Sequence, residues 1–229
     1  PDALDERGLT MTVVRQNFDQ DLEALRQDLV RMGEIVQVSI KDAVDALAKR
    51  DKDLARRVME GDDVIDRMQV EIEDRCISLI ARQQPVATDL RILGTGLKIT
   101  TDLERIGDHA FDIAKIVLLI GDEPLIKPLV DIPRMAEISQ QMLKDSLQAY
   151  LKLDIELAEQ VCRADDRVDE LYHQVFRELL TYMLEDAKKI KQATQLIFVA
   201  RYLERIADHS TNVAEWVIYL ATGERLRKK

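Results

Sequence analysis

Apolar residues recur at alternating steps of three and four along three stretches of the first half of the chain. This spacing puts them on one side of an α-helix, and a sustained seven-residue repeat favours packing of helix against helix. The first stretch predicts a long helix over residues 12–50, with a seam at Phe18, Leu22, Leu25, Leu29, Met32, Val36, Ser39 and Ala43. The second and third predicted helices carry their seams over residues 54–79 and 99–120.

The second half of the chain repeats the first. Apolar positions over 199–220 match those over 99–120 at an offset of 100, and positions over 157–175 match 54–72 at an offset of 103. A helix over about 132–153 would complete the second copy. Because short connections make sequential helices antiparallel, the sequence predicts an all-α fold of two tandem three-helix bundles, related by an internal pseudo-twofold repeat.

Prolines mark the boundaries between these helices. Pro124, Pro128 and Pro133 fall in GDEPLIKPLVDIP, which divides the chain near its middle. We therefore expect a first bundle over 1–120, a linker over 121–133 and a second bundle over 134–229. Pro85 marks another break, after which Thr88 or Asp89 is expected to cap the third helix.

Composition supports helices over strands. Glycine and proline, which turns and hairpins require, account for 8 and 5 of the 229 residues. Charged residues make up 33% and hydrophobic residues 46%, so the chain combines a core with an extensive polar surface.

The net charge of −10 narrows the classes of partner. Residues 1–120 carry 17 basic and 24 acidic side chains, which gives 17 − 24 = −7 of that total. Such a surface argues against nucleic acid as the main partner, and suits cations, basic partner surfaces or simply solubility. Cys76 and Cys162 lack metal-binding spacing and are expected to be buried reduced thiols. No apolar run is long enough to span a membrane, and the opening PDALDERGLTM lacks a secretion-signal layout, so we expect a cytoplasmic protein.

The strongest local identity between the halves is acidic. LERIGDH at 103–109 corresponds to LERIADH at 203–209. Helical spacing places acidic or amide side chains of this segment in one stripe per copy, and an acidic pair on the preceding helix faces each stripe. The candidate metal ligands are Asp62, Asp66, Glu104, Asp108 and Asp112 in the first copy, and Asp165, Asp169, Glu204, Asp208 and Asn212 in the second.

Carboxylates four residues apart on a helix repel one another unless something neutralises them. A hard cation such as Mg, Mn, Ca or ferric iron would do so, because these ions prefer oxygen ligands. The alternative is a solvated helix face, with Arg105 and Arg205 forming structural ion pairs. His109 and His209, beside the stripes, are either helix-packing residues or auxiliary ligands and partner contacts.

Two other motifs are incomplete as a di-iron site and as a phosphate-binding loop. Glu170 and His173 form an E-x-x-H unit, but a di-iron bundle needs two such units and further glutamates. The segment from Gly94 to Lys98 lacks the spacing of a phosphate-binding loop, so its glycines are expected to allow close helix packing. No Ser–His–Asp or Cys–His arrangement indicates nucleophilic catalysis.

The segments QPVATDLR, LERIGDHAFDIAK, YMLEDAKKI and LERIADHSTNVAEWVIYLATGE together resemble the PhoU family over nearly the whole chain. The resemblance implies a non-enzymatic negative regulator of the phosphate-starvation response and of phosphate uptake. Its implied partners are the ATPase subunit of the phosphate ABC transporter and the PAS region of a sensor histidine kinase, with membrane association only through these partners and no nucleic acid.

The resemblance also implies surface metal sites at the acidic stripes, mono- or multinuclear, with iron, manganese, magnesium and zinc all open. Because Asp112 stands where the second copy has Asn212, the first site is expected to bind metal more tightly. Ala207 replaces a glycine of the repeat and is expected to matter little. A homodimer is a further expectation. The other function classes considered are a metal-dependent hydrolase or oxidase on the bundle and a purely structural coiled coil.

Overall fold

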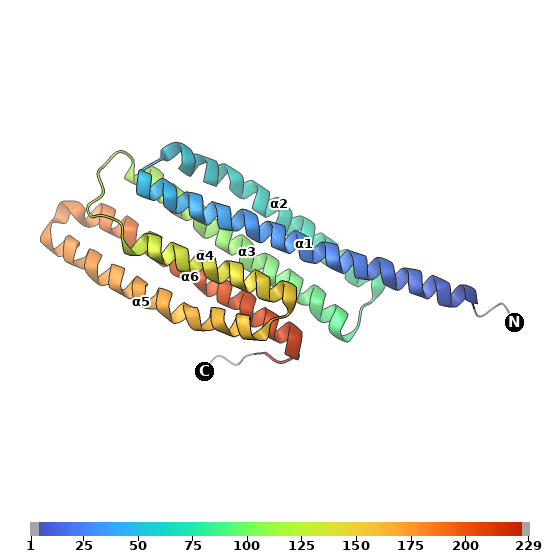
Figure 1. The fold of residues 1–229 in the computed structure, drawn as a ribbon. Coiled ribbons are helices and arrows are strands. Elements are labelled where there is room, and N and C mark those ends of the chain that lie inside the picture. The colour runs from blue at the N-terminus through green and yellow to red at the C-terminus, as the bar shows by residue number, and fades with distance from the viewer. Residues whose placement is uncertain (1–4, 226–229) are drawn as a thin grey trace.

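The computed structural model describes residues 5–225, with side chains from residue 15 onward, and its secondary structure is helical throughout. The helices are α1 (Asp5–Lys49), α2 (Lys52–Gln83), α3 (Ala87–Ile120), α4 (Asp131–Lys152), α5 (Ile155–Glu185) and α6 (Ile190–Thr222), with a short 3₁₀ helix, η1 (Ala187–Lys189), before α6. Helices α1–α3 form one antiparallel bundle and α4–α6 the other, side by side (Figure 1). The predicted all-α fold with two three-helix bundles is confirmed.

The same turn connects the first two helices of each bundle. Arg50 and Leu153 adopt left-handed backbone conformations, with φ of 55° and 52°. The next residue, Asp51 or Asp154, accepts hydrogen bonds from backbone N–H groups in the first turn of α2 or α5. These aspartates satisfy N–H groups that have no partner inside the helix. The repeat therefore extends to the local geometry of its turns.

The start of α3 differs from the prediction. Neither Thr88 nor Asp89 caps it; the N-cap residue is Val86, which makes no side-chain cap hydrogen bond. Asp89 lies inside the first turn of α3, where its carboxylate pairs with Arg15 of α1 at 2.6 Å. A carboxylate in the first turn is favourable beside the positive end of the helix dipole, so the long-range ion pair does not require the capping position.

The seam of α1 is buried as the spacing predicts, from Phe18 to Ala43, with one exception. Ser39 is only half-buried, and the neighbouring Ile40 is fully buried in its place. A straight α-helix drifts relative to a strict seven-residue repeat, so the buried face moves by one position over several turns.

Helices α3 and α6 are the central pair of the molecule. Each bundle packs its outer helices against one of them, and α3 also packs against α6. Small buried residues on the central helices permit close approach of an outer helix in each bundle. An added Cβ at Gly107 would stand 3.0 Å from Ile65 of α2. In the second bundle the corresponding residues are Ala207 and Val168. Compared with the first bundle, the central helix has one methyl group more and the outer helix one fewer, so the combined side-chain volume is conserved.

The linker is shorter than predicted and is bound to the second bundle. It spans residues 121–130, because Pro133 is the third residue of α4, in the first turn, where its missing N–H leaves no hydrogen bond unmade. The side chain of Gln192 accepts from the N–H of Ile126 at 2.6 Å and donates to the carbonyl of Pro124 at 3.1 Å. Lys127 forms an ion pair with Glu178 of α5.

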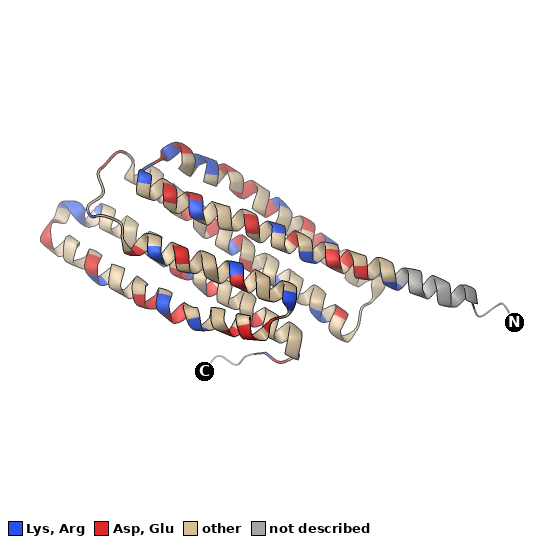
Figure 2. Ribbon diagram, viewed as in Figure 1, with Lys and Arg blue, Asp and Glu red and all other residues tan. Residues whose placement is uncertain are grey.

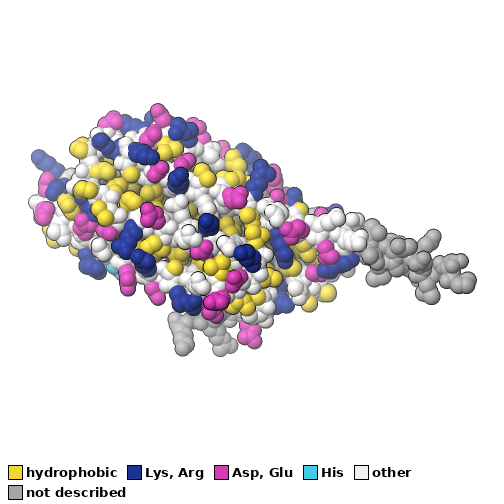
Figure 3. All heavy atoms as spheres, viewed as in Figure 1, with side chains coloured by type: hydrophobic (Ala, Val, Ile, Leu, Met, Phe, Trp, Pro, Cys, Tyr) yellow, Lys and Arg dark blue, Asp and Glu magenta, His cyan; other side chains and the backbone are white. Residues whose placement is uncertain are grey.

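The surface carries both signs of charge along the outer helices (Figure 2). The face in Figure 3 shows hydrophobic side chains between these charges. Within residues 5–225, no helix combines the length and apolar character needed to cross a bilayer. Cys76 is buried and Cys162 half-buried, both as free thiols, and burial raises the pKa of each to about 11. The start of the chain, which bears on the cytoplasmic prediction, lies mostly outside the residues with described side chains.

Gly33 offers a test of how tightly the two bundles pack. It lies on α1, and an added Cβ would collide with Leu147 of α4. We expect Gly33→Leu to lower the free energy of unfolding by about 1–3 kcal/mol, because overpacking forces the helices apart. Gly61→Leu is the matched control, since nothing lies within 4 Å of its added Cβ. Urea denaturation measures both, and equal stability of the two variants would contradict the packing described here.

Candidate functional site

The predicted carboxylates form two clusters, one on each bundle, along the seam between α2 and α3 and along the seam between α5 and α6. These two seams are called the first and the second groove. In the first groove, Asp62 and Asp66 of α2 lie near Glu104 and Asp108 of α3, because the buried Ile65 and Ile106 fix which sides of the two helices meet. In the second, residues 165 and 169 of α5 and residues 204 and 208 of α6 hold the equivalent positions. Helices α2 and α5 lie at opposite edges of the molecule, so the grooves are separate (Figure 1).

Crowding of negative charge is evident in the first groove. Burial, together with repulsion from Asp66, Asp108 and Glu104, raises the pKa of Asp62 to about 6. Burial and the charge of Asp108 also raise the pKa of Glu104, although Arg105 opposes the shift. Both effects favour the neutral carboxyl, so ionising this groove costs free energy that a bound cation would offset.

The second groove shows the same effect. Burial and repulsion from Asp208 raise the pKa of Glu204 to about 6, against the opposing charge of Arg201. Burial and Asp208 likewise raise the pKa of Asp169. Glu204 is only 8% exposed, which is more buried than a solvated outer helix face would be. The solvated-face alternative therefore does not describe this residue.

Arginines neutralise part of the charge, and unequally. Arg105 lies 3.5 Å from Glu104 and 3.1 Å from Asp108. In the second groove Arg205 lies 3.0 Å from Asp208, and a second arginine, Arg201, pairs with Glu204. The residue equivalent to Arg201 in the first half is Thr101, so the first groove has one cation fewer.

One oxygen in each groove makes no hydrogen bond. Oε2 of Glu104 and Oε2 of Glu204 are buried and have no hydrogen-bond partner among the described residues, although Oε2 of Glu104 lies 3.5 Å from Nε of Arg105. Within that part of the chain, no three His, Cys, Asp or Glu side chains are already close enough together to hold a metal ion. The donor types fit a hard cation, but binding one would require side-chain movement. The ligand set therefore stays a prediction.

The third members of the stripes face elsewhere. Asp112 accepts a hydrogen bond from Tyr202 of α6, and Asn212 donates one to Asp102 of α3 at 3.1 Å. Both contacts cross the interface between the bundles. The difference between Asp112 and Asn212 thus concerns the packing of α3 on α6. The two grooves themselves differ in their arginines.

The histidines belong to this same interface. Nδ1 of His209 lies 2.9 Å from Asp102. The ring of His109 stacks on Tyr202 at 5.6 Å between centroids and lies 5.7 Å from the ring of His209. Burial, followed by the charge of His209 and of nearby arginines, lowers the pKa of His109 to about 4, so it is neutral at pH 7. Of the two roles considered from the sequence, these contacts are those of helix packing.

This interface cluster was missed by sequence reasoning, although the repeat carries a signal for it. At the 100-residue offset, Asp102 corresponds to Tyr202 and Asp112 to Asn212. Each pair differs in a complementary way: one half supplies the acceptor and the other the donor. Here polar residues differ between the two copies at positions that flank a nearly identical segment. Such a difference indicates that these residues of one copy contact those of the other.

The remaining motifs take structural positions. Glu170 and His173 are exposed on α5, where the His173 ring lies 5.5 Å from that of Tyr172. The segment from Gly94 to Lys98 lies inside α3, so it forms no phosphate-binding loop. An added Cβ at Gly96 would lie 3.5 Å from Leu25, an ordinary van der Waals distance, and an added Cβ at Gly94 would meet nothing within 4 Å. Neither position therefore needs a glycine for close helix packing.

Comparisons with known proteins agree with this architecture. A family model described as the PhoU domain matches residues 29–117 and again 132–217. The chain is 47% identical to a protein of Clostridium acetobutylicum named phosphate-specific transport system accessory protein PhoU homolog, over 93% of this chain and 98% of that protein.

Two crystal structures have the same fold. One is PhoU from Pseudomonas aeruginosa, with a TM-score of 0.87 and 38% identity, covering 90% of this chain and all of that one. The other, from Streptococcus pneumoniae, is described as the phosphate transport system regulatory protein PhoU. It has a TM-score of 0.86 and 32% identity, and the match covers 92% of this chain and 100% of that chain.

Because the carboxylates of the first groove repel one another, we predict that replacing one of them with a neutral residue stabilises the fold, and that the gain depends on pH. A carboxyl whose folded pKa exceeds its unfolded value destabilises the fold when ionised, and this cost disappears as pH falls through 6 towards 4. We expect Asp62→Asn to raise the free energy of unfolding by about 1 kcal/mol near neutral pH without metal, a value reduced for partial solvent exposure.

Thermal denaturation over a pH series checks this expectation. The quantity compared is the free energy of unfolding of the variant minus that of the parent. This difference cancels the contribution of His109, whose lowered pKa makes the fold less stable as pH falls. Asp63→Asn, an exposed neighbour on the same helix, serves as the control and should change stability little. A gain that is as large near pH 4 as near pH 7 would contradict the charge crowding.

Proposed function

The chain belongs to the PhoU family, and we propose that it regulates phosphate transport as an accessory protein rather than an enzyme. The observation that carries this proposal is the full-length match: the family model occurs in both halves, and the relatives named above are accessory or regulatory proteins of a phosphate transport system. The metal-dependent hydrolase or oxidase considered from the sequence gains no support from these names.

In more detail, the chain acts as an adaptor between the ATPase subunit of the phosphate ABC transporter and the PAS region of a sensor histidine kinase. When phosphate is plentiful, it holds the kinase in its repressing state and restrains uptake. It works in the cytoplasm, reaches the membrane only through its partners, and does not bind nucleic acid. A homodimer is part of the same proposal.

Exposed apolar side chains on the second bundle support a role in protein contacts. On α5 and α6, Phe176 is 40% exposed, Leu180 43% and Phe198 51%. Phe198 also packs against Tyr202, with 6.4 Å between ring centroids. Exposed aromatic residues of this kind are enriched among the residues that anchor protein interfaces.

Complementation tests the adaptor proposal. In a strain lacking its own PhoU-family protein, expression of this chain should restore repression of alkaline phosphatase in phosphate-rich medium. The double variant Phe176→Asp, Phe198→Asp should lose repression, because removing central apolar anchors typically weakens an interface by about 2 kcal/mol or more. Leu119→Asp, at an exposed position of α3, should retain repression. Failure of the unmodified chain to repress would contradict the proposal.

We propose secondly that each groove binds a divalent or ferric cation, with iron, manganese, magnesium and zinc as candidates. The support is the raised pKa of Asp62 and Glu204, together with the buried Oε2 atoms of Glu104 and Glu204 that make no hydrogen bond. In the absence of a cation, these features are unfavourable in both bundles. The first groove is expected to bind more tightly, since the second contains the additional cation Arg201.

Calorimetric titration with Mn²⁺ tests this second proposal. The parent chain should show a tighter and a weaker site; Asp108→Ala should remove the tighter one, and Asp208→Ala the weaker. Arg201→Thr should bring the second site close to the affinity of the first. Arg177→Thr, an exposed α5 arginine outside the groove, is the control. Equal losses from the two aspartate variants, or no effect of Arg201→Thr, would contradict the asymmetry.

A further inference from the structure

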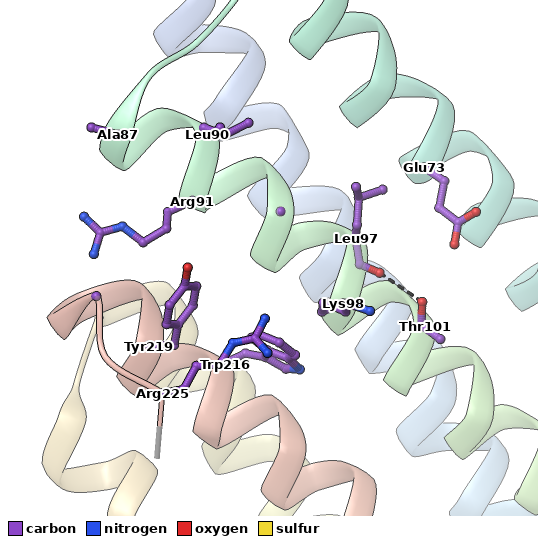
Figure 4. Close-up of a pocket in the computed structure, with 12 residues that line it drawn as sticks. Glu73, Ala87, Leu90, Arg91, Leu97, Lys98, Thr101, Trp216, Tyr219 and Arg225 are labelled. Atoms are coloured by element: carbon purple, nitrogen blue, oxygen red, sulfur yellow. Dashed lines mark hydrogen bonds between the residues drawn. The ribbon is translucent and has the colours of Figure 1, made fainter. Parts of the chain in front are cut away.

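A pocket of about 770 Å³ opens between the first turns of α3 and the last turns of α6, and it extends to Thr101, next to the first acidic groove (Figure 4). This volume lies within the usual range for small-molecule sites. Arg91 and Lys98 line it from α3, Trp216 and Tyr219 from α6, and Arg225 from the segment that follows α6. The pocket is therefore built by both bundles.

The charge of the pocket is opposite to that of the chain. Three cationic side chains line it, and Glu73 of α2 is the one carboxylate among its described lining residues. The protein as a whole has a net charge of −10. Within the described chain, Arg91, Lys98 and Arg225 form no ion pair, so Glu73 is the one opposing charge in the described lining.

The aromatic rings give the pocket a second kind of surface. The rings of Trp216 and Tyr219 stand edge to face, 5.9 Å apart. The guanidinium of Arg225 lies 5.2 Å from the centre of the Trp216 ring and 5.7 Å from that of Tyr219. Gly223, at φ 79°, turns the chain back after α6, and an added Cβ there would run into the guanidinium of Arg91. Cations and rings are thus held at one end of the pocket.

The combination of cations and aromatic rings occurs in this pocket but not at the positions that correspond to it in the other copy of the repeat. At the 100-residue offset, the positions of Trp216 and Tyr219 are held by Ile116 and Leu119, and that of Lys98 by Phe198. Unlike the acidic grooves, the pocket is therefore not a by-product of the duplicated scaffold. Gly94, on the pocket wall, leaves open space where a side chain would otherwise stand.

We propose that this pocket binds an organic phosphate that carries a planar ring, of the nucleotide class. Arg and Lys side chains suit phosphate oxygens, and Trp and Tyr rings stack on a flat heterocycle. Inorganic phosphate alone would leave the aromatic surface and most of the volume unused. The site is independent of the partners and of the metal grooves proposed above.

The single tryptophan of the chain makes the pocket directly observable. ATP is titrated into the full-length chain without divalent ions, so that the acidic grooves contribute nothing. Trp216 fluorescence is excited at the red edge of its band, where adenine does not absorb. We expect a saturable change with ATP that inorganic phosphate and adenosine, at matched ionic strength, do not produce.

Two variants probe the charge and the space separately. Arg91→Gln should weaken ATP binding roughly tenfold or more, the usual effect of losing a charge-assisted hydrogen bond. Lys144→Gln, an exposed lysine of α4, makes the same change of charge outside the pocket and should leave the affinity unchanged. Gly94→Leu should weaken ATP binding by narrowing the pocket, whereas Gly61→Leu, on α2, should not; both positions have room for a side chain.

Several results would overturn the proposal. They are the absence of a saturable change with ATP, an equal response to inorganic phosphate, and equal losses in Arg91→Gln and Lys144→Gln. Unchanged ATP affinity in Gly94→Leu would do the same. An acidic peptide that binds the pocket more tightly than ATP would reassign it as a protein-docking site.

Discussion

Helices α3 and α6 pack against each other through the middle of the molecule, and every other helix packs against one of them. A polar cluster fixes their register: Asp102 accepts from His209 and Asn212, while Tyr202 pairs with Asp112. Sliding one helix along the other would leave these half-buried groups without partners, which is costly away from water. This register sets where the grooves and the pocket lie, since all of them are built on α3 or α6.

The acidic grooves and the pocket use charge in opposite ways on the same two helices. In the grooves, carboxylates repel one another across a short distance, and arginines relieve only part of that repulsion. In the pocket, cations gather beside aromatic rings with little opposing charge. The crowding of carboxylates in the grooves is unfavourable for the isolated protein, as expected where side chains are placed for a ligand rather than for stability.

The sequence is sufficient to predict the helices, the repeat and the four carboxylate pairs, because each depends on spacing within one helix. It predicts less well what depends on contacts between distant segments. Asp112 and Asn212 were placed with the acidic stripes, but the α3–α6 interface turns them towards the other bundle. Asp89 was expected to cap a helix and instead pairs with Arg15. The pocket joins Arg91 to Trp216, which are far apart in sequence and share no local motif.

The anchored linker limits how two copies of this chain can associate. Exchange of whole bundles between two chains, known as domain swapping, needs a connection that can swing free. Here Gln192 and Glu178 hold the linker against the second bundle, and the α3–α6 interface would have to open as well. Any dimer of this protein should therefore form by contact between complete, closed chains, and its dissociation should release folded monomers.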